Sequence, residues 1–226
     1  MFKKTFSMIC CVIFLQGCSQ EQEVKKEMTN METALLAATE KNETNTVISL
    51  LKQGANINAT DNQGRTPLMI ATYKNDVKTA KALIESGADV NIQDDMKNNP
   101  FLYAGAEGYL DILKLTIDAG ADPTITNRYG GTALIPASEH GYIDVIKELL
   151  TRTNIDVNHV NNLGWTALME AILLNNGNET QQQVIRLLIE HGADVNIPDH
   201  DGVTPLEHAH AHHFEEIEKI LLKGRK

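Results

Sequence analysis

The residues best suited to chemistry are the histidines near the C-terminal end, which are His200, His208, His210, His212 and His213. His208 and His212 are four residues apart, so on a helix both rings would lie on one side and could contact the same metal ion. The three cysteines lie at positions 10, 11 and 18 and cannot add thiolate ligands to this group. His208 and His212 are therefore weak candidate metal ligands, and we predict no cofactor.

Nucleophilic catalysis has no support in the sequence. It contains no G-x-S-x-G motif, which would place a serine on a strained turn, and no glycine-rich phosphate loop. The aspartates Asp61, Asp89, Asp122 and Asp194 recur at regular intervals and suit turn formation better than acid–base chemistry. We interpret the chain as a non-enzymatic protein.

The charge balance bears on the kind of partner. Asp and Glu number 30 and Lys and Arg number 20, which gives a formal net charge of −10 at pH 7. A protein that binds the phosphate backbone of a nucleic acid needs a basic surface to displace counterions. The sequence has no basic stripe of this kind, so we expect no nucleic-acid partner.

The elements that position these residues are clearest in residues 61–91. Thr66 and Pro67 open a helix, because a threonine hydroxyl can accept hydrogen bonds from free amides and proline fits the first helical turn. Asn75 and Asp76 end that helix, and the apolar pattern predicts a second helix over residues 77–86. Gly87 then stands where a helix ends in the left-handed conformation. This helix pair has one apolar face, so it must pack against a neighbouring pair.

The same unit recurs along the chain. The positions equivalent to Thr66 are Thr33, Asn99, Thr132, Thr166 and Thr204, and the helix-ending glycines are Gly54, Gly87, Gly120 and Gly192. This period of about 33 residues, with its T-P-L and G-A-D-x-N segments, resembles the ankyrin repeat. The resemblance implies an all-α fold, an ankyrin-repeat solenoid of about six helix-turn-helix repeats with β-turn fingers, and a monomer.

The N-terminal residues follow a different pattern. Two lysines precede an apolar run over residues 6–15, which is too short to span a bilayer and is typical of an export signal. The segment L-Q-G-C at residues 15–18 resembles the bacterial lipobox, whose cysteine is lipidated and becomes the new N-terminus. The resemblance implies lipidation at Cys18 and a lipid anchor in the bacterial cell envelope, on the outer membrane facing the periplasm. Cleavage near Gly17 without a lipid is the alternative.

The predicted organisation is a lipoprotein signal peptide at 1–17, a lipidated tether at 18–30 and an ankyrin-repeat domain at 31–224. The repeats lie near 31–60, 61–93, 94–126, 127–160, 161–198 and 199–224. Three departures from the pattern carry expectations. Lys97 replaces a turn glycine, which predicts a looser finger, and Asn154 is expected to end a helix in the left-handed conformation. Residues 175–183 are expected to form an insertion between the two helices of the fifth repeat.

Ankyrin-like stacks usually dock partners on a concave face, formed by the turn tips and the exposed side of each first helix. Carried over by repeat position, the resemblance assigns as partner-binding candidates Arg65, Tyr73, Lys74, Met96, Arg128, Tyr129, His140, Leu163, Trp165, His200 and His212. Trp165 is the only tryptophan, and such side chains often dominate binding energy. Its alternative role is to fold back over its neighbours. His210 and His213 fall on repeat positions that serve packing and the turn between helices.

The sequence favours a non-catalytic protein-binding module, tethered to the membrane in the periplasm, that binds a partner protein through its concave face. It would scaffold that partner or inhibit it as an immunity protein does. The alternative is an accessory protein that handles metal or haem through the C-terminal histidines, for example in support of a periplasmic catalase. Both functions stay open at this point.

Overall fold

The computed structural model describes residues 30–224, which contain helices and loops and no strand. Residues 30–40 are helical. The helices that follow are α2 (Thr44–Lys52), α3 (Pro67–Tyr73), α4 (Val77–Glu85), α5 (Pro100–Ala106), α6 (Leu110–Asp118), α7 (Leu134–His140), α8 (Ile143–Arg152), α9 (Ala167–Leu173), α10 (Glu179–Glu190), α11 (Pro205–Ala211) and α12 (Glu215–Gly224). The predicted all-α solenoid is confirmed.

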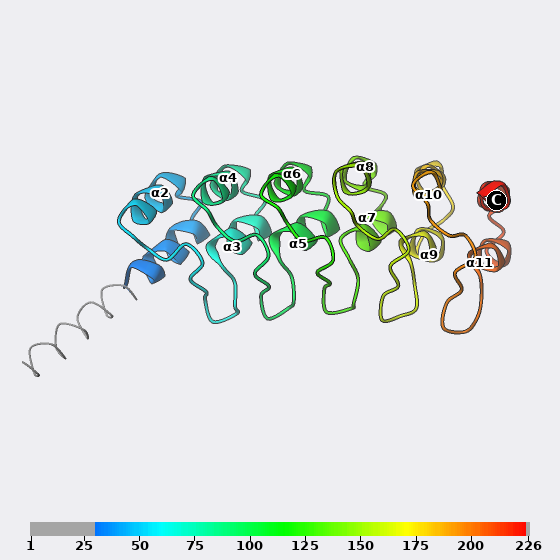
Figure 1. Ribbon diagram of the computed structural model, residues 1–226, viewed down its shortest axis with the longest axis horizontal. Coiled ribbons are helices and arrows are strands. Elements are labelled where there is room, and N and C mark those ends of the chain that lie inside the picture. Colours follow the sequence, from blue (N-terminus) through cyan, green and yellow to red (C-terminus); the bar gives the residue numbers. More distant parts are fainter. Residues whose placement is uncertain (1–29, 225–226) are drawn as a thin grey trace, which may run out of the picture.

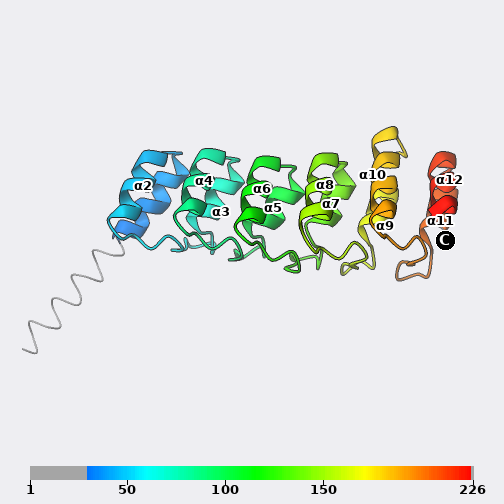
Figure 2. The ribbon, with the colours of Figure 1, turned by 45° about the horizontal axis from the view of Figure 1, so that its top comes forward.

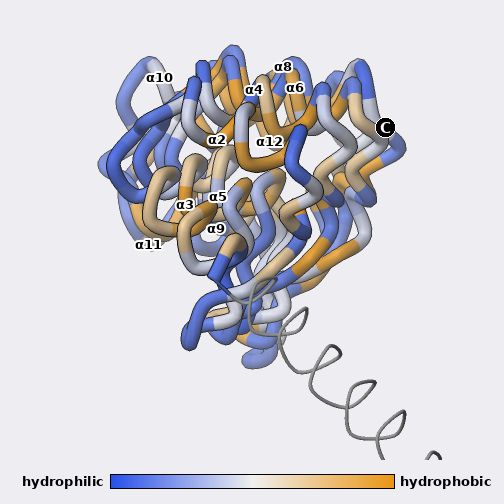
Figure 3. The backbone as a smooth tube through the Cα atoms, turned by 90° about the vertical axis from the view of Figure 1, so that its left-hand side faces the viewer, coloured by the Kyte–Doolittle hydropathy of each residue, from blue (hydrophilic) through white to orange (hydrophobic). Residues whose placement is uncertain are grey.

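The helices form two parallel rows. Figure 1 shows the second helices of the repeats (α2, α4, α6, α8, α10 and α12) in one row and the first helices (α3, α5, α7, α9 and α11) in the row below. The loops that connect each repeat to the next project beneath both rows, and we call these loops the fingers. Figure 2 shows the helix pairs stacked one beside the next along the long axis. Viewed along that axis, the fingers are mostly hydrophilic (Figure 3).

The centre of the core is formed by one apolar position that recurs in the first helices. Leu68, Phe101, Leu134 and Leu168 stand two residues after their helix-opening Thr or Asn, and each is at most 1% exposed. Each of these side chains belongs to the continuous cluster that runs through all the described repeats. No helix pair could bury this surface alone, so packing between neighbouring repeats supplies the hydrophobic stabilisation.

Helices α3, α5, α9 and α11 begin directly after their predicted cap residues because the caps form. The prediction is wrong for Thr33, which lies inside the helix of residues 30–40 and does not open it. Thr66 Oγ1 accepts the Met69 N–H at 3.1 Å, and Asn99 Oδ1 accepts the Leu102 N–H at 2.8 Å. Thr132 is a second exception, since its hydroxyl is buried without a partner in the described structure. The Ile135 N–H, which is equivalent to the Met69 N–H, donates to Thr132 O at 3.3 Å, and Pro136 has no N–H to donate to that carbonyl as Ile70 does to Thr66 O.

Each finger is shaped by one Asp or Asn. Asp61 Oδ1 accepts the backbone N–H groups of Gln63 and Arg65 at 2.8 and 2.9 Å. The same pair of bonds recurs at Asp94, Asn127, Asn161 and Asp199. This repeated side-chain bond confirms the turn-forming role predicted for Asp61.

Two expectations about loop conformation were wrong. Lys97 adopts φ of +58° and its N–H donates to Asp94 O at 2.8 Å, so its finger closes as the glycine-containing fingers do. Asn154 does not end α8 in the left-handed conformation. The cap residue is Thr153 in an extended conformation, and its hydroxyl donates to Leu149 O at 2.6 Å. A side-chain bond here replaces the backbone turn that glycine makes elsewhere.

The insertion predicted between the two helices of the fifth repeat, residues 175–183, is only partly a connection. Residues 175–178 lie between α9 and α10, whereas residues 179–183 form the first turns of α10, because Asn178 caps that helix. The residues of the insertion pack back onto the preceding repeat. Asn175 Nδ2 and Gln181 Nε2 both donate to Glu139 O, at 2.9 and 3.0 Å. Gln181 is buried, so the insertion forms part of the contact between the fourth and fifth repeats.

Candidate protein-binding surface

The concave face is the surface formed by the inner side of the fingers and the exposed side of α3, α5, α7, α9 and α11. Three consecutive finger tips on it carry large apolar side chains, Met96, Tyr129 and Leu163. They are 47%, 55% and 53% exposed. Each stands two residues after the Asp or Asn that shapes its finger, so the repeat places the three side chains in one row. We call these three residues the tip ladder.

Arg128 joins two members of the tip ladder. Its Nη1 donates to Met96 Sδ at 3.4 Å, and its Nη2 donates to the Tyr129 hydroxyl at 2.8 Å. The guanidinium carbon also lies 4.7 Å from the centroid of the Tyr129 ring, where a cation is attracted by the ring face. These contacts hold the exposed side chains in place before any partner binds, which lowers the entropy lost on association.

The predicted residues of the second repeat lie in a network of charges. Arg65 donates to Glu40 Oε1 at 3.0 Å and to Asp61 Oδ2 at 2.7 Å, and Lys74 Nζ lies 3.8 Å from Glu40 Oε2. The Tyr73 hydroxyl donates to Asp94 Oδ2 at 2.5 Å. Burial and this bond to Asp94 raise the pKa of Tyr73 to about 12.

A pocket of about 310 Å³ opens between the finger that precedes α3 and the finger that precedes α5. It is lined by Gln63, Arg65, Tyr73, Asp94, Asp95 and Met96. The structure therefore brings Arg65, Tyr73 and Met96 together as one part of the concave face.

The fourth and fifth repeats hold two further predicted residues. His140 is exposed, and its Nδ1 lies 3.1 Å from Pro136 O and 3.8 Å from Glu139 Oε2. Trp165 is partly buried. This burial lies between the two predicted arrangements, an exposed side chain that binds a partner and a side chain folded back over its neighbours.

A buried carboxyl group, Glu170, lies close to Trp165 in the sequence and was not predicted. It is 6% exposed, and its Oε1 accepts Asn161 Nδ2 at 2.7 Å. Burial, with a further effect of the Glu139 charge, raises the pKa of Glu170 to about 7. The signal that could have found Glu170 is its repeat position, which holds Ile70 and Tyr103 in the second and third repeats.

The C-terminal histidines are dispersed. His208 Nε2 lies 2.7 Å from Asp199 Oδ2, whereas the exposed His212 ring stacks on Phe214 with centroids 5.3 Å apart. His200 packs over Gly164, where an added Cβ would lie 2.5 Å from its ring. Within residues 30–224, no three His, Cys, Asp or Glu side chains are grouped to hold a metal ion.

The predictions for the other two histidines had different outcomes. His213 adopts φ of +60° and forms the turn between α11 and α12, as predicted. The packing role of His210 was wrong, because its side chain is 81% exposed. The equivalent Thr72 is buried by the repeat that follows it, and no described repeat follows α12.

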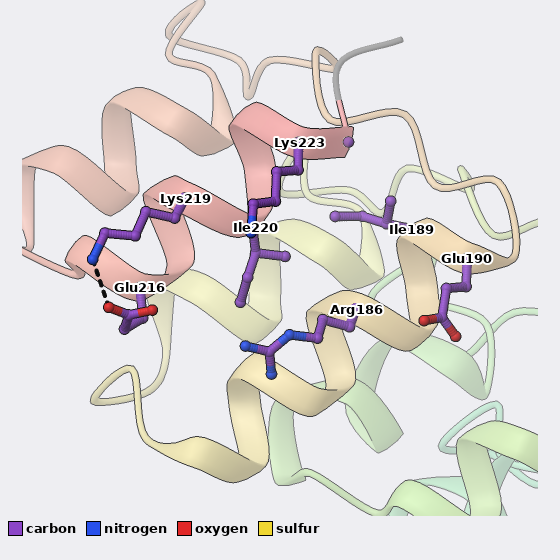
Figure 4. Close-up of a pocket in the computed structure, with 8 residues that line it drawn as sticks. Arg186, Ile189, Glu190, Glu216, Lys219, Ile220 and Lys223 are labelled. Atoms are coloured by element: carbon purple, nitrogen blue, oxygen red, sulfur yellow. Dashed lines mark hydrogen bonds and ion pairs between the residues drawn. The ribbon is translucent and has the colours of Figure 1, made fainter.

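A separate pocket of about 570 Å³ lies between α10 and α12, in the row of second helices. Figure 4 shows its lining residues, with Lys219 donating to Glu216 at 2.7 Å. Arg186, Glu190 and Lys223 complete its charged rim. The pocket has both signs of charge and lies apart from the tip ladder, so we do not include it in the concave face.

The lipidation site Cys18 lies outside the described residues. Among residues 30–224, no helix has the length and apolar character needed to cross a membrane.

Comparisons with known proteins agree with the repeat pattern. The family model described as ankyrin repeats (3 copies) matches residues 5–94 and 101–196. The Escherichia coli K12 ankyrin repeat protein YahD is 51% identical over 76 residues, which are 34% of this chain and 38% of that protein. The match thus spans well under half the length of that relative.

Solved structures match over most of the chain. An ankyrin repeat domain from Acinetobacter baumannii AYE aligns with a TM-score of 0.82 at 49% identity, covering 84% of this chain and 96% of that one. The ankyrin repeat protein EF0377 gives a TM-score of 0.82 at 42% identity, with 85% and 98% covered. The ankyrin repeat domain of Bcl-3, 23% identical with a TM-score of 0.75 and covering 85% of this chain and 86% of that one, is alike in fold alone. With more than half of its residues matched by the family model, the chain belongs to the ankyrin-repeat family.

Proposed function

We propose that the protein is a membrane-tethered binding module that captures a partner protein on its concave face in the periplasm, and scaffolds or inhibits it. Ankyrin repeats are protein-interaction modules, which supports a non-catalytic binding role. The export signal and the L-Q-G-C segment support the tether and the compartment. The finer roles, scaffold or immunity-type inhibitor, depend on the partner.

One observation carries the choice of surface. The tip ladder places three large apolar side chains at equivalent, exposed positions of consecutive fingers. Folding does not require them there, because each finger is shaped by the Asp or Asn two residues earlier. Grouped apolar side chains that the fold leaves free are typical of a surface that binds another protein.

The test is a triple variant, Met96→Ser, Tyr129→Ser and Leu163→Ser. We expect it to fold normally and to bind a partner recovered from envelope extracts about tenfold more weakly or worse, because anchor residues supply most of the binding energy. The measurement is quantitative capture of the same identified protein by the wild type and the variant.

Leu222→Ser is the matched control. Leu222 on α12 is 53% exposed, as Leu163 is, but it lies away from the fingers. The control should keep the wild-type affinity. Equal capture of the partner by the triple variant and the wild type would contradict the proposed surface.

A further inference from the structure

Two carboxylates of the concave face, Glu139 and Glu170, are neighbours by repeat geometry. Glu139 stands seven residues after Thr132, and Glu170 stands four residues after Thr166. The same two positions of the second and third repeats hold Tyr73 and Tyr103, whose ring centroids are 4.4 Å apart. The repeat thus brings these two positions into contact, and in the fourth and fifth repeats both carry an acid.

The first repeat shows how the chain normally neutralises an acid at this place. Glu40 occupies the position of Glu139, seven residues after Thr33. Two cations of the next repeat hold it, Arg65 at 3.0 Å and Lys74 at 3.8 Å. Glu40 is therefore compensated within the protein.

The two cations are missing at Glu139. Trp165 takes the position of Arg65, directly before the helix-opening threonine, and Leu174 takes the position of Lys74. The adjacent Asn175 donates to Glu139 O at 2.9 Å, so the Leu174 end of α9 does approach Glu139. By repeat position, Glu139 therefore has Trp165 and Leu174 where Glu40 has Arg65 and Lys74.

Glu170 adds a second acid with little internal compensation. It is more than nine-tenths buried, and the neutral Asn161 amide is the one described side chain that donates to it. Neither of its oxygens is among the sealed polar atoms that lack a partner in residues 30–224, so the oxygen that Asn161 does not contact keeps some access to solvent. His140 Nδ1 lies 3.8 Å from Glu139 Oε2.

We propose that Glu139 and Glu170, with Trp165 beside them, form a recess that receives an arginine or lysine side chain of the partner protein. The incoming cation would stand in for Arg65 and Lys74 of the second repeat. The Glu139 carboxylate and the ionised form of Glu170 would neutralise its charge, and an indole ring favours a cation over its face. The inference rests on the proposed function and specifies the partner as a protein with an exposed cationic side chain.

The test uses the full chain and a simple probe, the peptide acetyl-Gly-Arg-Gly-amide. Its citrulline analogue has nearly the same shape and no charge. Trp165 is the only tryptophan, so its fluorescence reports on the recess directly. We expect millimolar concentrations of the arginine peptide, and not of the citrulline peptide, to change this fluorescence. An equal response to both peptides would overturn the proposal.

Two variants test the residues. Glu139→Gln with Glu170→Gln should weaken binding of the arginine peptide about tenfold or more, because both charges are removed. Its matched control, Glu107→Gln with Asp201→Asn, also removes two exposed acids and should keep the wild-type affinity. If the two double variants weaken binding equally, the effect is that of net charge and the recess is wrong. Circular dichroism checks that each is folded.

A further variant places the missing cation on the protein itself. Leu174→Lys recreates the arrangement of Lys74 and should compete with the peptide, whereas Leu174→Gln should not. Because these assays contain no partner protein, they separate the two proposals. If the arginine peptide does not bind but the triple variant of the tip ladder still loses partner capture, the cation recess alone is wrong. If the peptide binds but the triple variant captures the partner as well as the wild type does, the proposed surface alone is wrong.

Discussion

Glu170 and His208 stand at the same position of consecutive repeats, yet their surroundings have opposite electrostatic effects. His208 lies 2.7 Å from Asp199, and the hydrogen bond to that ring lowers the pKa of the Asp199 carboxyl. Glu170 instead meets the neutral Asn161 and the acidic Glu139, and burial raises its pKa. The residue at this repeat position thus stabilises a neighbouring carboxylate in the sixth repeat, and is itself a carboxyl group whose ionised form burial disfavours in the fifth.

This difference predicts how stability changes with pH. The Glu170 carboxyl has a pKa of about 7 in the folded chain, against an ordinary value of 4.5. Between these values the folded chain binds more protons than the unfolded chain, so the free energy of unfolding falls as the pH rises. Glu170→Gln cannot ionise and should be more stable than the wild type by about 1–3 kcal/mol at pH 8, with little difference at pH 4.

Urea denaturation at the two pH values measures this effect. Glu107→Gln alters an exposed acid on the same face and is the control. It should change the free energy of unfolding only slightly, and by the same amount at pH 4 and at pH 8. A Glu170→Gln variant that is less stable than the wild type at pH 8 would show that the ionised carboxylate has a compensating partner.

The residue pattern could reveal most of the individual roles, but not this one. The turn-forming Asp61 and the left-handed His213 follow from one repeat read alone. The pairing of Glu139 with Glu170 needs the register between two repeats, because the two side chains meet only across the interface. Trp165 likewise shows its relation to Arg65 only when the finger of one repeat is compared with the helix of the one before.

At the scale of the helix, the caps differ in a way that a variant pair can measure. Thr166 Oγ1 accepts the Met169 N–H at 3.2 Å, whereas the buried Thr132 hydroxyl has no partner in the described structure. Thr166→Val should therefore cost about 1 kcal/mol of stability, the usual value of a lost cap. Thr132→Val should be neutral or stabilising, because it removes a buried polar group that is not hydrogen-bonded.

Thermal unfolding of the two valine variants and the wild type gives the comparison. The threonines have equivalent positions and similar burial, so each serves as the other's control. A loss of stability in Thr132→Val as large as that in Thr166→Val would mean that the Thr132 hydroxyl is hydrogen-bonded in solution.

Element boundaries were predictable where a single residue decides them. Thr66 and Pro67 begin α3 as expected, because cap and proline act locally. The prediction failed at Asn154, where the hydroxyl of Thr153 bonds to Leu149 O and replaces the left-handed turn. It also failed at Lys97, because the hydrogen bonds that Asp94 accepts from the Met96 and Asn98 N–H groups hold the finger closed despite the strain of a positive φ at lysine.

The whole molecule is held together by contacts between neighbours. Asn58 Oδ1 accepts the Asp89 N–H at 3.0 Å, and the equivalent Asn91 and Asn158 make the same bond to the repeat that follows. Thr124 occupies this position in the third repeat, and its hydroxyl donates to Asp122 of its own repeat at 2.7 Å. The stack is thus a series of local interfaces, as expected for a solenoid.

The anchoring of the whole molecule to a membrane through Cys18 stays a prediction from the sequence. We expect Cys18→Ser to move the protein from the membrane fraction to the soluble fraction, because each buried methylene of an acyl chain contributes about 0.8 kcal/mol. Fractionation and metabolic labelling with a fatty-acid analogue measure the change. Cys10→Ser with Cys11→Ser is the control and should remain labelled. A Cys18→Ser protein that still sediments with membranes contradicts the anchor.

The finger design has a consequence for how this protein can change its specificity. Each loop keeps its shape through an Asp or Asn at its base and a left-handed residue beyond the tip, while the tip side chain between them takes no part in that closure. Different side chains can therefore occupy the tip position without changing the shape of the finger. A lineage could acquire a new binding preference by point substitution at Met96, Tyr129 or Leu163 without destabilising the fold.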